Sequence, residues 1–380
     1  MRVCGHNAPM QRVPARIGDP LEAVETPALV VDLDAFEHNL DLMANAVRGS
    51  GLALRPHAKS HKCPDIAKAQ VARGAVGVCC QKVDEAAAFV AAGIADVLVT
   101  NEIVAPSKIA RLAALAQSAT IGVLVDDARV VADLSAAAVH AGGTVHVYVE
   151  IDVGAGRCGV APGEAAVVIA QAASAAKGLR FRGIHAYQGA AQHLRSPGER
   201  RAAIERASAL AGQTKRAIER AGIECPVITG AGTGTWQLER DSHVYTELQP
   251  GSYVFMDADY ARNALAPDEH AFEHSLYVLS SVMSVPAADR AVVDAGLKAL
   301  SVDSGLPVVH ATRGLHYAKA SDEHGVLDVD RSQAEPAIGD RVWLIPGHCD
   351  PTVNLYDWLV GMRGPRVECV WPVSARGALG

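Results

Sequence analysis

A cluster of basic side chains follows an apolar run in the stretch Ala53-Leu-Arg-Pro-His-Ala-Lys-Ser-His-Lys-Cys-Pro64. Among these groups, Lys59 is the one that could act as a nucleophile. A lysine attacks a carbonyl only as the neutral amine, and burial or neighbouring cations lower its pKa. The stretch therefore predicts either a reactive lysine beside Arg55, His57 and Lys62 or a solvated loop at the end of a strand.

A second group with chemical potential is the stretch Pro346-Gly-His-Cys-Asp-Pro-Thr352. Residues two apart on extended backbone point to the same side, so His348 and Asp350 could share one metal ion while Cys349 faces away. One imidazole and one carboxylate suit a divalent ion such as Mn²⁺, Mg²⁺ or Zn²⁺ and leave positions open for water or substrate. The same spacing occurs by chance in many loops, so a plain structural turn is the alternative.

Two glycine-rich segments could bind phosphate. The stretch Gly154-Ala-Gly-Arg-Cys-Gly159 matches the dinucleotide pattern G-x-G-x-x-G, which would indicate a nicotinamide oxidoreductase. However, the following predicted strand does not end in the acidic residue that binds ribose, and four βα units precede the pattern. The other segment, Gly230-Ala-Gly-Thr-Gly-Thr235, and Gly251-Ser-Tyr253 follow the last two predicted strands of the series, where barrels often bind phosphate. Combined with a strand-end lysine, they predict a phosphorylated carbonyl cofactor, with a tight turn as the alternative.

These groups need elements that bring them together, and the sequence predicts them. Short β-rich runs alternate with Ala-rich helical segments from about residue 52 onward, which is typical of βα units. The predicted strands are 52–58, 75–81, 95–101, 120–126, 145–152, 181–187, 225–231 and 244–250, and the predicted helices are 64–73, 84–92, 106–117, 128–141, 163–177 and 198–221. Eight such strands predict a (β/α)8 TIM-type barrel, and a doubly wound open sheet is the alternative.

The strand ends of a parallel barrel meet at one rim, where the chemistry of such folds lies. Polar groups follow each predicted strand: His57, Lys59 and His61, then Gln81, Asn101, Asp126, Asp152 with Arg157, Tyr187 and Gln188 with His193 close behind, the 230–235 segment, and finally Gly251, Ser252 and Tyr253. We therefore expect these side chains to line one site.

After about residue 270 the helical periodicity disappears and β-type runs with Gly, Pro and Asp turns replace it, which predicts an antiparallel β domain. We expect a barrel over residues 25–270 and a β domain over residues 271–380, which carries the candidate metal pair and which residues 1–24 also join. The strand predicted at 27–34 could belong to either domain.

Composition restricts the partners. The 380 residues carry a formal net charge of -7, which argues against nucleic acid and anionic membranes as partners, because those require clustered Lys and Arg. No apolar run approaches the roughly 20 residues of a membrane span, and the first twenty residues lack the apolar segment of a signal peptide. Eight scattered cysteines without a C-x-x-C pair suggest neither a zinc knuckle nor a disulfide framework. We expect a cytoplasmic protein that acts on a small molecule.

Several motifs together resemble the D-threonine aldolase family, from about residue 20 to the end. They are Arg55-Pro-His-Ala-Lys-Ser-His-Lys62, Cys79-Cys-Gln-Lys82, Asp152-Val-Gly-Ala-Gly-Arg-Cys-Gly159, Ala186-Tyr187, Gly251-Ser-Tyr253 and His348-x-Asp350. Relatives of that family are the D-3-hydroxyaspartate aldolases and the metal-dependent D-serine dehydratases, which are fold-type III pyridoxal phosphate enzymes similar to alanine racemase.

The resemblance implies that Lys59 forms the Schiff base with pyridoxal 5'-phosphate and that Arg157 faces the pyridine nitrogen. It also implies that the cofactor ring or phosphate is held by Gln81, Tyr187, Thr233, Gly251, Ser252 and Tyr253. In this family His348 and Asp350 bind the divalent metal, with Mn²⁺ or Mg²⁺ ahead of Zn²⁺. His193 is the candidate base for the substrate hydroxyl, and a metal-bound water could serve instead.

The activity implied is retro-aldol cleavage of D-threonine and related β-hydroxy-α-D-amino acids, 3-hydroxy-D-aspartate among them, to glycine and an aldehyde. The sequence departs from the family at Gln188, where members often have histidine, and Asp350 stands where the dehydratases typically have a thiolate. A D-serine or D-threonine dehydratase of the same fold and a non-catalytic carrier of pyridoxal phosphate are the alternatives. The resemblance also implies a homodimer.

Overall fold

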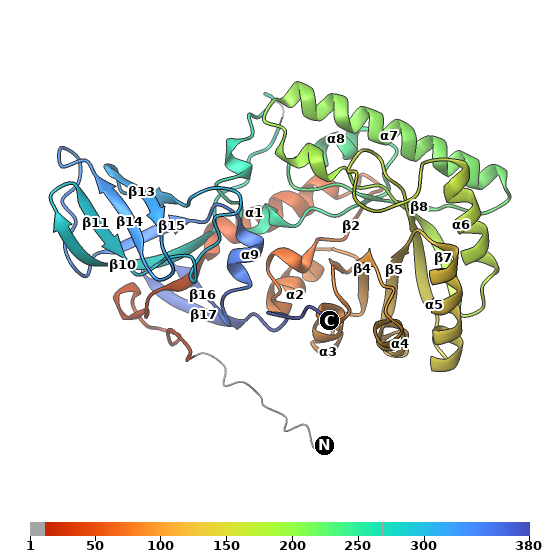
Figure 1. Ribbon diagram of the computed structural model, residues 1–380, viewed down its shortest axis with the longest axis horizontal. Helices are drawn as coiled ribbons and strands as arrows, with labels where there is room; N and C mark the ends of the chain where they lie inside the picture. Colours follow the sequence, from red (N-terminus) through yellow and green to blue (C-terminus); the bar gives the residue numbers. More distant parts are fainter. Residues whose placement is uncertain (1–11, 268) are drawn as a thin grey trace, which may run out of the picture.

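The computed structural model describes residues 12–267 and 269–380, which form two lobes (Figure 1). The larger lobe contains a parallel sheet surrounded by helices, and the smaller lobe is built mainly of β-strands. A single hydrophobic cluster runs from the barrel helices through Phe255 and Leu276 to Val278 and Cys349, so the two lobes share a continuous core. None of the helices in the described part of the chain is both long enough and apolar enough to span a membrane.

The parallel sheet of the larger lobe has eight strands within the described residues, and all eight predicted strands are confirmed. They are β2 (Ala53–Leu54), β3 (Val78–Cys80), β4 (Asp96–Glu102), β5 (Thr120–Val125), β6 (Val145–Glu150), β7 (Leu179–His185), β8 (Val227–Gly230) and β9 (Glu247–Leu248), in the order β2-β9-β8-β7-β6-β5-β4-β3. The first and last strands also meet, because His57 bridges to Cys79 and Val76 N donates to Leu54 O at 2.9 Å. The sheet is therefore a TIM-type barrel and not a doubly wound open sheet.

The six predicted helices are also present on the outside of the barrel. They are α2 (Pro64–Ala72), α3 (Val83–Ala91), α4 (Pro106–Leu115), α5 (Ala128–Ala141), α6 (Glu164–Ala175) and α7 (Pro197–Arg220). Proline begins α2, α4 and α7, where its missing N–H removes no helical hydrogen bond. These boundaries could be predicted because the local signals agree with the tertiary packing.

Two further helices lie beside the junction of the lobes and were not predicted. Helix α1 (Leu33–Val47) begins after Asp32, whose side chain accepts hydrogen bonds from Asp34 N and Ala35 N. The short helix α9 (Cys349–Val353) lies between the lobes (Figure 1). It contains Asp350, one of the two predicted metal ligands.

The smaller lobe is a nine-stranded sheet within the described residues. Its strands are β1 (Ala28–Asp32), β10 (Leu276–Ala287), β11 (Arg290–Val293), β12 (Val308–His310), β13 (Leu315–Ala320), β14 (Gly325–Val329), β15 (Arg341–Ile345), β16 (Trp358–Arg363) and β17 (Arg366–Pro372). The printed pairings are antiparallel apart from that of β1 with β16. Strand β16 had not been predicted.

The strand predicted at 27–34 lies in the smaller lobe, since β1 pairs with β10 and β16. Pro20 also bridges to Arg366 in that lobe. We propose on this basis that the β domain includes residues 12–32 as well as the C-terminal region. The prediction that residues 1–24 join the β domain falls partly on residues 1–11, which lie outside the described residues.

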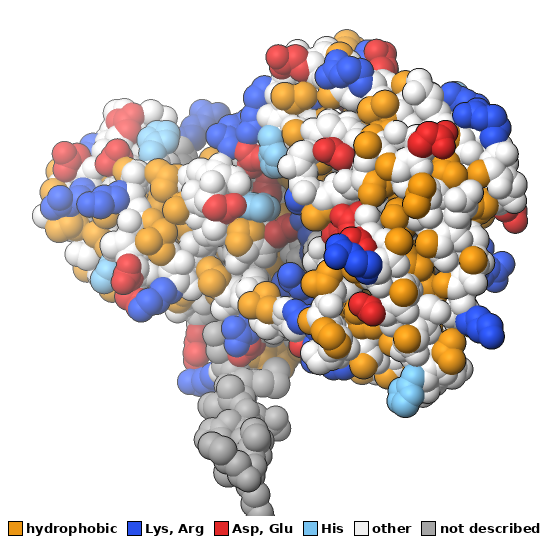
Figure 2. All heavy atoms as spheres, turned by 45° about the vertical axis from the view of Figure 1, so that its right-hand side comes forward, with side chains coloured by type: hydrophobic (Ala, Val, Ile, Leu, Met, Phe, Trp, Pro, Cys, Tyr) orange, Lys and Arg blue, Asp and Glu red, His pale blue; other side chains and the backbone are white. Residues whose placement is uncertain are grey.

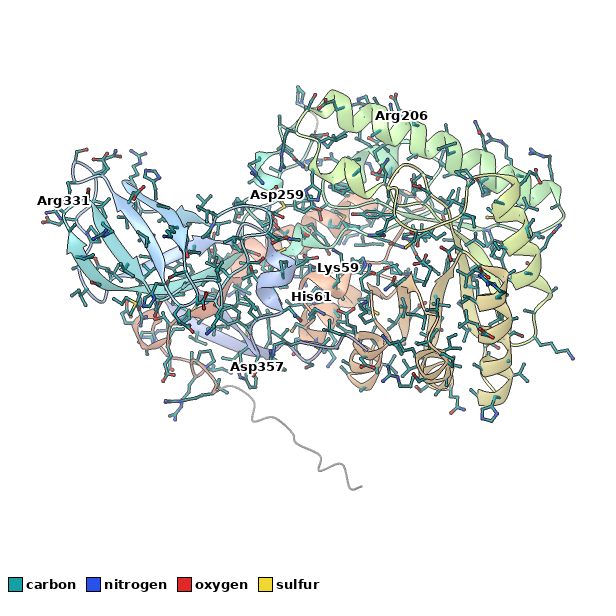
Figure 3. The ribbon with its side chains drawn as sticks, viewed as in Figure 1. Lys59, His61, Arg206, Asp259, Arg331 and Asp357 are labelled. Atoms are coloured by element: carbon teal, nitrogen blue, oxygen red, sulfur yellow. The ribbon has the colours of Figure 1, made fainter. Side chains whose placement is uncertain are left out.

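The lobes meet at the mouth of the barrel through backbone hydrogen bonds. Ala258 N donates to Pro346 O at 3.0 Å, and Ala375 N donates to Lys62 O at 3.0 Å. Figure 3 shows Lys59 and Asp259 at this junction, whereas Arg206 and Arg331 lie on outlying parts of the two lobes. The loops that follow the barrel strands are thus held against the loop that leads into α9.

Candidate active site

A cavity of about 270 Å³ lies at the carboxyl ends of the barrel strands. It is lined by His57, Lys59, Gln81, Thr100, Arg157, His185, Tyr187, Ala231, Gly232, Thr233, Gln249, Gly251, Ser252 and Tyr260. Seven of the eight predicted cofactor-binding residues are among them. The convergence follows from the fold, because parallel strands bring their carboxyl ends to one rim.

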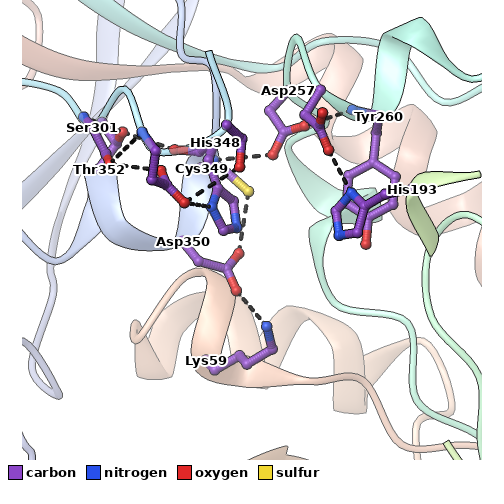
Figure 4. A network of polar contacts seen from close by, with 12 residues as sticks. Lys59, His193, Asp257, Tyr260, Ser301, His348, Cys349, Asp350 and Thr352 are labelled. Atoms are coloured by element: carbon purple, nitrogen blue, oxygen red, sulfur yellow. Dashed lines mark hydrogen bonds and ion pairs between the residues drawn. The ribbon is translucent and has the colours of Figure 1, made fainter. Parts of the chain in front are cut away.

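Lys59 lies in a 3-10 turn, η2 (Ala58–Ser60), directly after β2. His57 precedes this turn, and its Nδ1 accepts a hydrogen bond from Lys59 N at 3.3 Å. The side chain of Lys59 extends to Asp350, with Nζ donating to Oδ2 at 2.6 Å (Figure 4). Lys59 therefore joins the barrel to the smaller lobe inside the cavity.

The predicted effect of neighbouring cations on Lys59 is wrong. The Asp350 carboxylate raises the pKa of Lys59 above its ordinary value, and burial only partly opposes this shift. The cations near it in sequence have acidic partners of their own: Arg55 Nε donates to Glu247 at 2.9 Å, and Lys62 pairs with Glu85. The cations that lie close to Lys59 in the sequence are therefore neutralised by acidic partners in the structure, and they do not lower the pKa of Lys59.

His57 is the residue of that cluster that remains in the cavity beside Lys59. Burial, together with the charge of Lys59, lowers the pKa of His57 well below its ordinary value, so the ring is neutral. Because Nδ1 accepts from Lys59 N, the proton lies on Nε2, which donates to Thr100 Oγ1 at 2.9 Å. Gln81 Nε2 also donates to Thr100 Oγ1, at 3.1 Å. These contacts fix one wall of the cavity.

The loops after β8 and β9 form the part of the cavity that would accommodate a phosphate. Thr233 Oγ1 is buried and has no hydrogen-bond partner among the described residues, although Thr233 lines the cavity. A Cβ at Gly251 would lie 2.9 Å from His57 O, so only glycine allows this close approach. Buried polar groups normally have partners, and an anion accepting from Thr233 would satisfy the hydroxyl. The residues present therefore fit a phosphorylated cofactor.

Tyr253 is the predicted cofactor-binding residue whose side chain does not reach the cavity. It is 1% exposed and packs against Phe272 at a ring-centroid distance of 5.5 Å. Its hydroxyl accepts a hydrogen bond from Gln70 Nε2 at 3.1 Å. Tyr253 supports the loop from behind.

Arg157 reaches the cavity from the loop after β6. Its guanidinium carbon lies 6.0 Å from the centroid of the Tyr187 ring, and its Nη2 lies 3.9 Å from Oε1 of Glu150. The G-x-G-x-x-G pattern that contains Arg157 does not begin a helix here: Asp152 Oδ1 accepts from Gly154 N and Gly156 N, which closes a compact loop. The pattern therefore serves to present Arg157.

The predicted metal ligands His348 and Asp350 do not lie on one extended segment, as the sequence had suggested. His348 is extended, but Asp350 lies in the first turn of α9, so the two residues do not alternate along a strand. His348 Nδ1 lies 2.8 Å from Asp303 Oδ2, and Asp350 is bonded to Lys59. Although burial favours the neutral acid, Lys59 and His348 hold the pKa of Asp350 well below its ordinary range. No group of three or more metal-ligating side chains occurs within residues 12–267 and 269–380.

His193 is not among the described residues that line the cavity, but its ring packs against Tyr260, which does line it. The two ring centroids are 5.7 Å apart, and His193 Nδ1 lies 2.6 Å from Asp259 Oδ2 (Figure 4). Burial favours protonation of Asp259, but Arg195, Arg262 and His193 hold the pKa of that carboxyl below its usual value. The carboxylate fixes the His193 proton on Nδ1, which leaves Nε2 as the acceptor.

Sequence reasoning missed several residues of the site. Asp303 and Asp259 hold the two histidines, and Asp257 Oδ2 accepts from Cys349 N at 3.0 Å at the start of α9. The pair Asp257-Ala-Asp259 soon after the predicted last strand was a usable signal, because strand-end carboxylates often orient histidines. Asp303 lies in an irregular loop and carried no such signal.

Comparison with known proteins gives matches over almost the whole chain. The family model for the alanine racemase N-terminal domain matches residues 31–259, and that for a putative serine dehydratase domain matches residues 275–362. The 3-hydroxy-D-aspartate aldolase of Paracoccus denitrificans (strain Pd 1222) is 50% identical over 371 residues, which cover 96% of this chain and 95% of that protein.

A solved structure gives a match of similar strength. The crystal structure of D-threonine aldolase from Filomicrobium marinum is 50% identical, with a TM-score of 0.95 and coverage of 97% of this chain and 100% of that one. The D-threo-3-hydroxyaspartate dehydratase of Delftia sp. (strain HT23) is more distant, at 29% identity over 88% of this chain and 93% of that protein.

Proposed function

The chain belongs to the family that contains the D-threonine and 3-hydroxy-D-aspartate aldolases, and from this premise we propose that it cleaves D-threonine and related β-hydroxy-α-D-amino acids to glycine and an aldehyde. It is a carbon–carbon lyase. The observation that supports this reaction most strongly is the 2.6 Å contact between Asp350 and Lys59, which lines the cavity. Retro-aldol cleavage needs an amine nucleophile close to a group that polarises the β-hydroxyl.

We propose that Lys59 carries pyridoxal phosphate. Thr233, Gly251 and Ser252 would hold its phosphate, and Arg157 with Tyr187 would contact the ring. When bound, this cofactor accepts the electron pair released at the substrate Cα. An arginine cannot take a proton from the ring nitrogen, so Arg157 would leave that nitrogen unprotonated.

A divalent metal would be held by His348 and Asp350, and Asp303 is the residue that orients His348. With its Nδ1 engaged by Asp303, the imidazole presents Nε2 as a ligand. When bound, the metal polarises the substrate β-hydroxyl. An imidazole and a carboxylate, without a thiolate, favour Mn²⁺ or Mg²⁺ over Zn²⁺.

His193 is the proposed base for the proton of the β-hydroxyl. Its partner Asp259 stabilises the imidazolium that forms when Nε2 takes this proton. Loss of the hydroxyl proton forms the aldehyde C=O as the Cα–Cβ bond breaks, and a proton returned to Cα completes glycine. His57 is neutral, so His57 and Thr100 add no further charge to this wall of the cavity.

We also propose that the protein is a homodimer and that it acts in the cytoplasm. The first proposal rests on the resemblance to fold-type III enzymes. The face of the molecule in Figure 2 intersperses acidic, basic and histidine side chains without one large patch of a single sign, which agrees with a small-molecule partner. Sedimentation analysis of the purified protein tests the dimer, and a single species with the mass of one chain would contradict it.

Product identity tests the activity. Purified protein is incubated with pyridoxal phosphate, Mn²⁺ and D-threonine, and the products are identified. Glycine with acetaldehyde is the expected result. The appearance of 2-oxobutanoate with ammonia would make the protein a dehydratase, and bound cofactor without turnover of either D-threonine or 3-hydroxy-D-aspartate would indicate a carrier. Measuring turnover of both substrates in parallel shows whether the site prefers the β-methyl of D-threonine or the β-carboxylate of 3-hydroxy-D-aspartate.

A further inference from the structure

Asp257 lies between two parts of the candidate site that different regions of the chain supply. It follows the last barrel strand, its side chain is fully buried, and each of its carboxylate oxygens accepts a backbone hydrogen bond. Oδ2 accepts from Cys349 N, the first amide of α9, at 3.0 Å, and Oδ1 accepts from Tyr260 N at 2.9 Å (Figure 4). One carboxyl group therefore joins α9 to the turn that follows β9.

The start of α9 has an amide that needs such a partner. The first N–H groups of a helix have no acceptor within the helix, and the side chain that precedes the helix often caps them. Here the preceding residue is His348, whose side chain makes no capping hydrogen bond within the described part of the chain and lies 2.8 Å from Asp303. Asp257 supplies the acceptor instead, so a residue beyond the smaller lobe fixes how α9 begins. Asp350 is the second residue of this helix.

On its other side, Asp257 begins the turn that holds the candidate base. Its carbonyl oxygen accepts from Ala261 N at 3.1 Å, which closes the turn. Within the turn, Asp259 Oδ2 lies 2.6 Å from His193 Nδ1. The Tyr260 ring packs against the His193 ring and lines the cavity. The residue that supports α9 and the residues that support His193 therefore belong to one turn.

Backbone contacts continue the same junction, and the carboxylate completes it. Asp259 N donates to Gly347 O at 3.2 Å, next to the hydrogen bond between Ala258 N and Pro346 O. Burial raises the pKa of Asp257, and the two amides that it accepts from oppose this shift. Asparagine has nearly the same shape, but only one of its two terminal atoms can accept a hydrogen bond. An asparagine at this position would leave one of the two buried amides without an acceptor.

We propose that Asp257 is a positioning residue that fixes α9 relative to the turn that holds His193, so that Asp350 and His193 act on the same substrate hydroxyl. Asp257 is not one of the described residues that line the cavity, and it acts through the amides of Cys349 and Tyr260. The inference rests on the proposed function for the roles of Asp350 and His193. The two hydrogen bonds themselves do not depend on that assignment.

Hydrogen exchange of the full-length protein, followed by mass spectrometry, tests the junction directly. Asp257→Asn should speed exchange in peptides covering residues 346–353 about tenfold or more, because the Cys349 amide loses its acceptor. Peptides from α5 should exchange as in the wild type, which shows that the variant is folded. Asp133→Asn, at an exposed position of α5, is the matched control and should leave 346–353 unchanged. Wild-type exchange of 346–353 in Asp257→Asn would overturn the proposal.

Steady-state kinetics test the consequence for catalysis. Asp257→Asn should lower kcat about tenfold and change KM little, because the substitution displaces reacting groups and leaves the substrate contacts in place. In a His193→Ala background the same substitution should lower kcat much less, since the base that it positions is absent. Equal reductions in the two backgrounds would show a purely structural role and overturn the proposal. Wild-type protein without turnover would contradict the proposed function, whereas the exchange result needs no substrate, metal or cofactor.

Discussion

The amine of Lys59 donates a hydrogen bond of 2.6 Å to the carboxylate of Asp350, although 291 positions separate the two residues in the chain. One belongs to the first loop of the barrel and the other to a short helix of the smaller lobe. The proposed attachment point of the cofactor and a proposed ligand of the metal are therefore adjacent. Each side chain can be replaced separately, and the two substitutions should have different effects on cofactor binding and on turnover.

Replacing Lys59 with alanine should remove the visible absorption of bound pyridoxal phosphate and lower turnover at least about a thousandfold, because the amine is the covalent attachment point. Absorption spectra and aldehyde formation measure the two effects. Lys68→Ala, on the exposed side of α2, is the matched control and should retain both. A Lys59→Ala protein with normal spectrum and turnover would move the attachment to another residue.

Asp350→Ala should retain the bound cofactor but lose the metal-stimulated part of the cleavage, since the carboxylate is a proposed ligand. Turnover is compared with and without added Mn²⁺, and again in a chelator. Asp328→Ala, which removes an exposed carboxylate from β14, serves as the control. Wild-type protein with full activity in the chelator would refute a metal role altogether.

Asp303→Asn should weaken metal binding by about ten- to a hundredfold, because the carboxylate 2.8 Å from His348 Nδ1 fixes the orientation of that ring. Titration calorimetry with Mn²⁺ measures the affinity directly and needs no substrate. Asp322→Asn, an exposed aspartate on the same lobe, should leave the affinity unchanged. If Asp303→Asn also had no effect, His348 would have another orienting partner or no role as a ligand.

His193→Ala should lower kcat by about a hundredfold or more while changing cofactor affinity little, because a general base acts on the reacting proton. Asp259→Asn should lower kcat in the same direction, since it disturbs the proton on His193 Nδ1. Steady-state kinetics and cofactor titration separate the two effects. Wild-type turnover of the His193 variant would transfer the base role to a metal-bound water.

His185 should make the stability depend on acidity in a defined direction. Burial lowers its pKa from 6.5 to about 4, so the unfolded chain binds a proton between these values while the folded protein does not. The contribution of neutral His185 to the free energy of unfolding is fully present above pH 6.5. As the pH falls towards about 4, this contribution decreases by about 3 kcal/mol. The difference in unfolding free energy between wild type and His185→Gln, measured by urea denaturation at several pH values, should shrink over this range. A difference that stays constant would show that His185 is not neutral and buried in solution.

The sequence by itself determined the repeating part of the fold and most of the cavity lining. Strands such as Val145–Glu150 and helices such as Pro197–Arg220 follow from local periodicity and proline positions, and the same signals hold in the tertiary structure. Once the repeat indicated a barrel, its geometry required strand-end residues such as Lys59, Gln81 and Thr233 to share one rim. Strand β16 and helix α1 were missed, although Asp32, which caps the N-terminus of α1, was a usable signal for that helix.

Only the tertiary structure decided how the charges pair. Arg55 and Lys62 are neighbours of Lys59 in sequence, yet their side chains point to Glu247 and Glu85, while Lys59 points to Asp350. The structure also placed Asp350 on a helix. Local propensity depends on residues a few positions apart, whereas the pKa of a buried group depends on whichever charges the fold brings within several ångströms. For this reason the sequence singled out Lys59 as the candidate nucleophile but predicted its electrostatic environment wrongly.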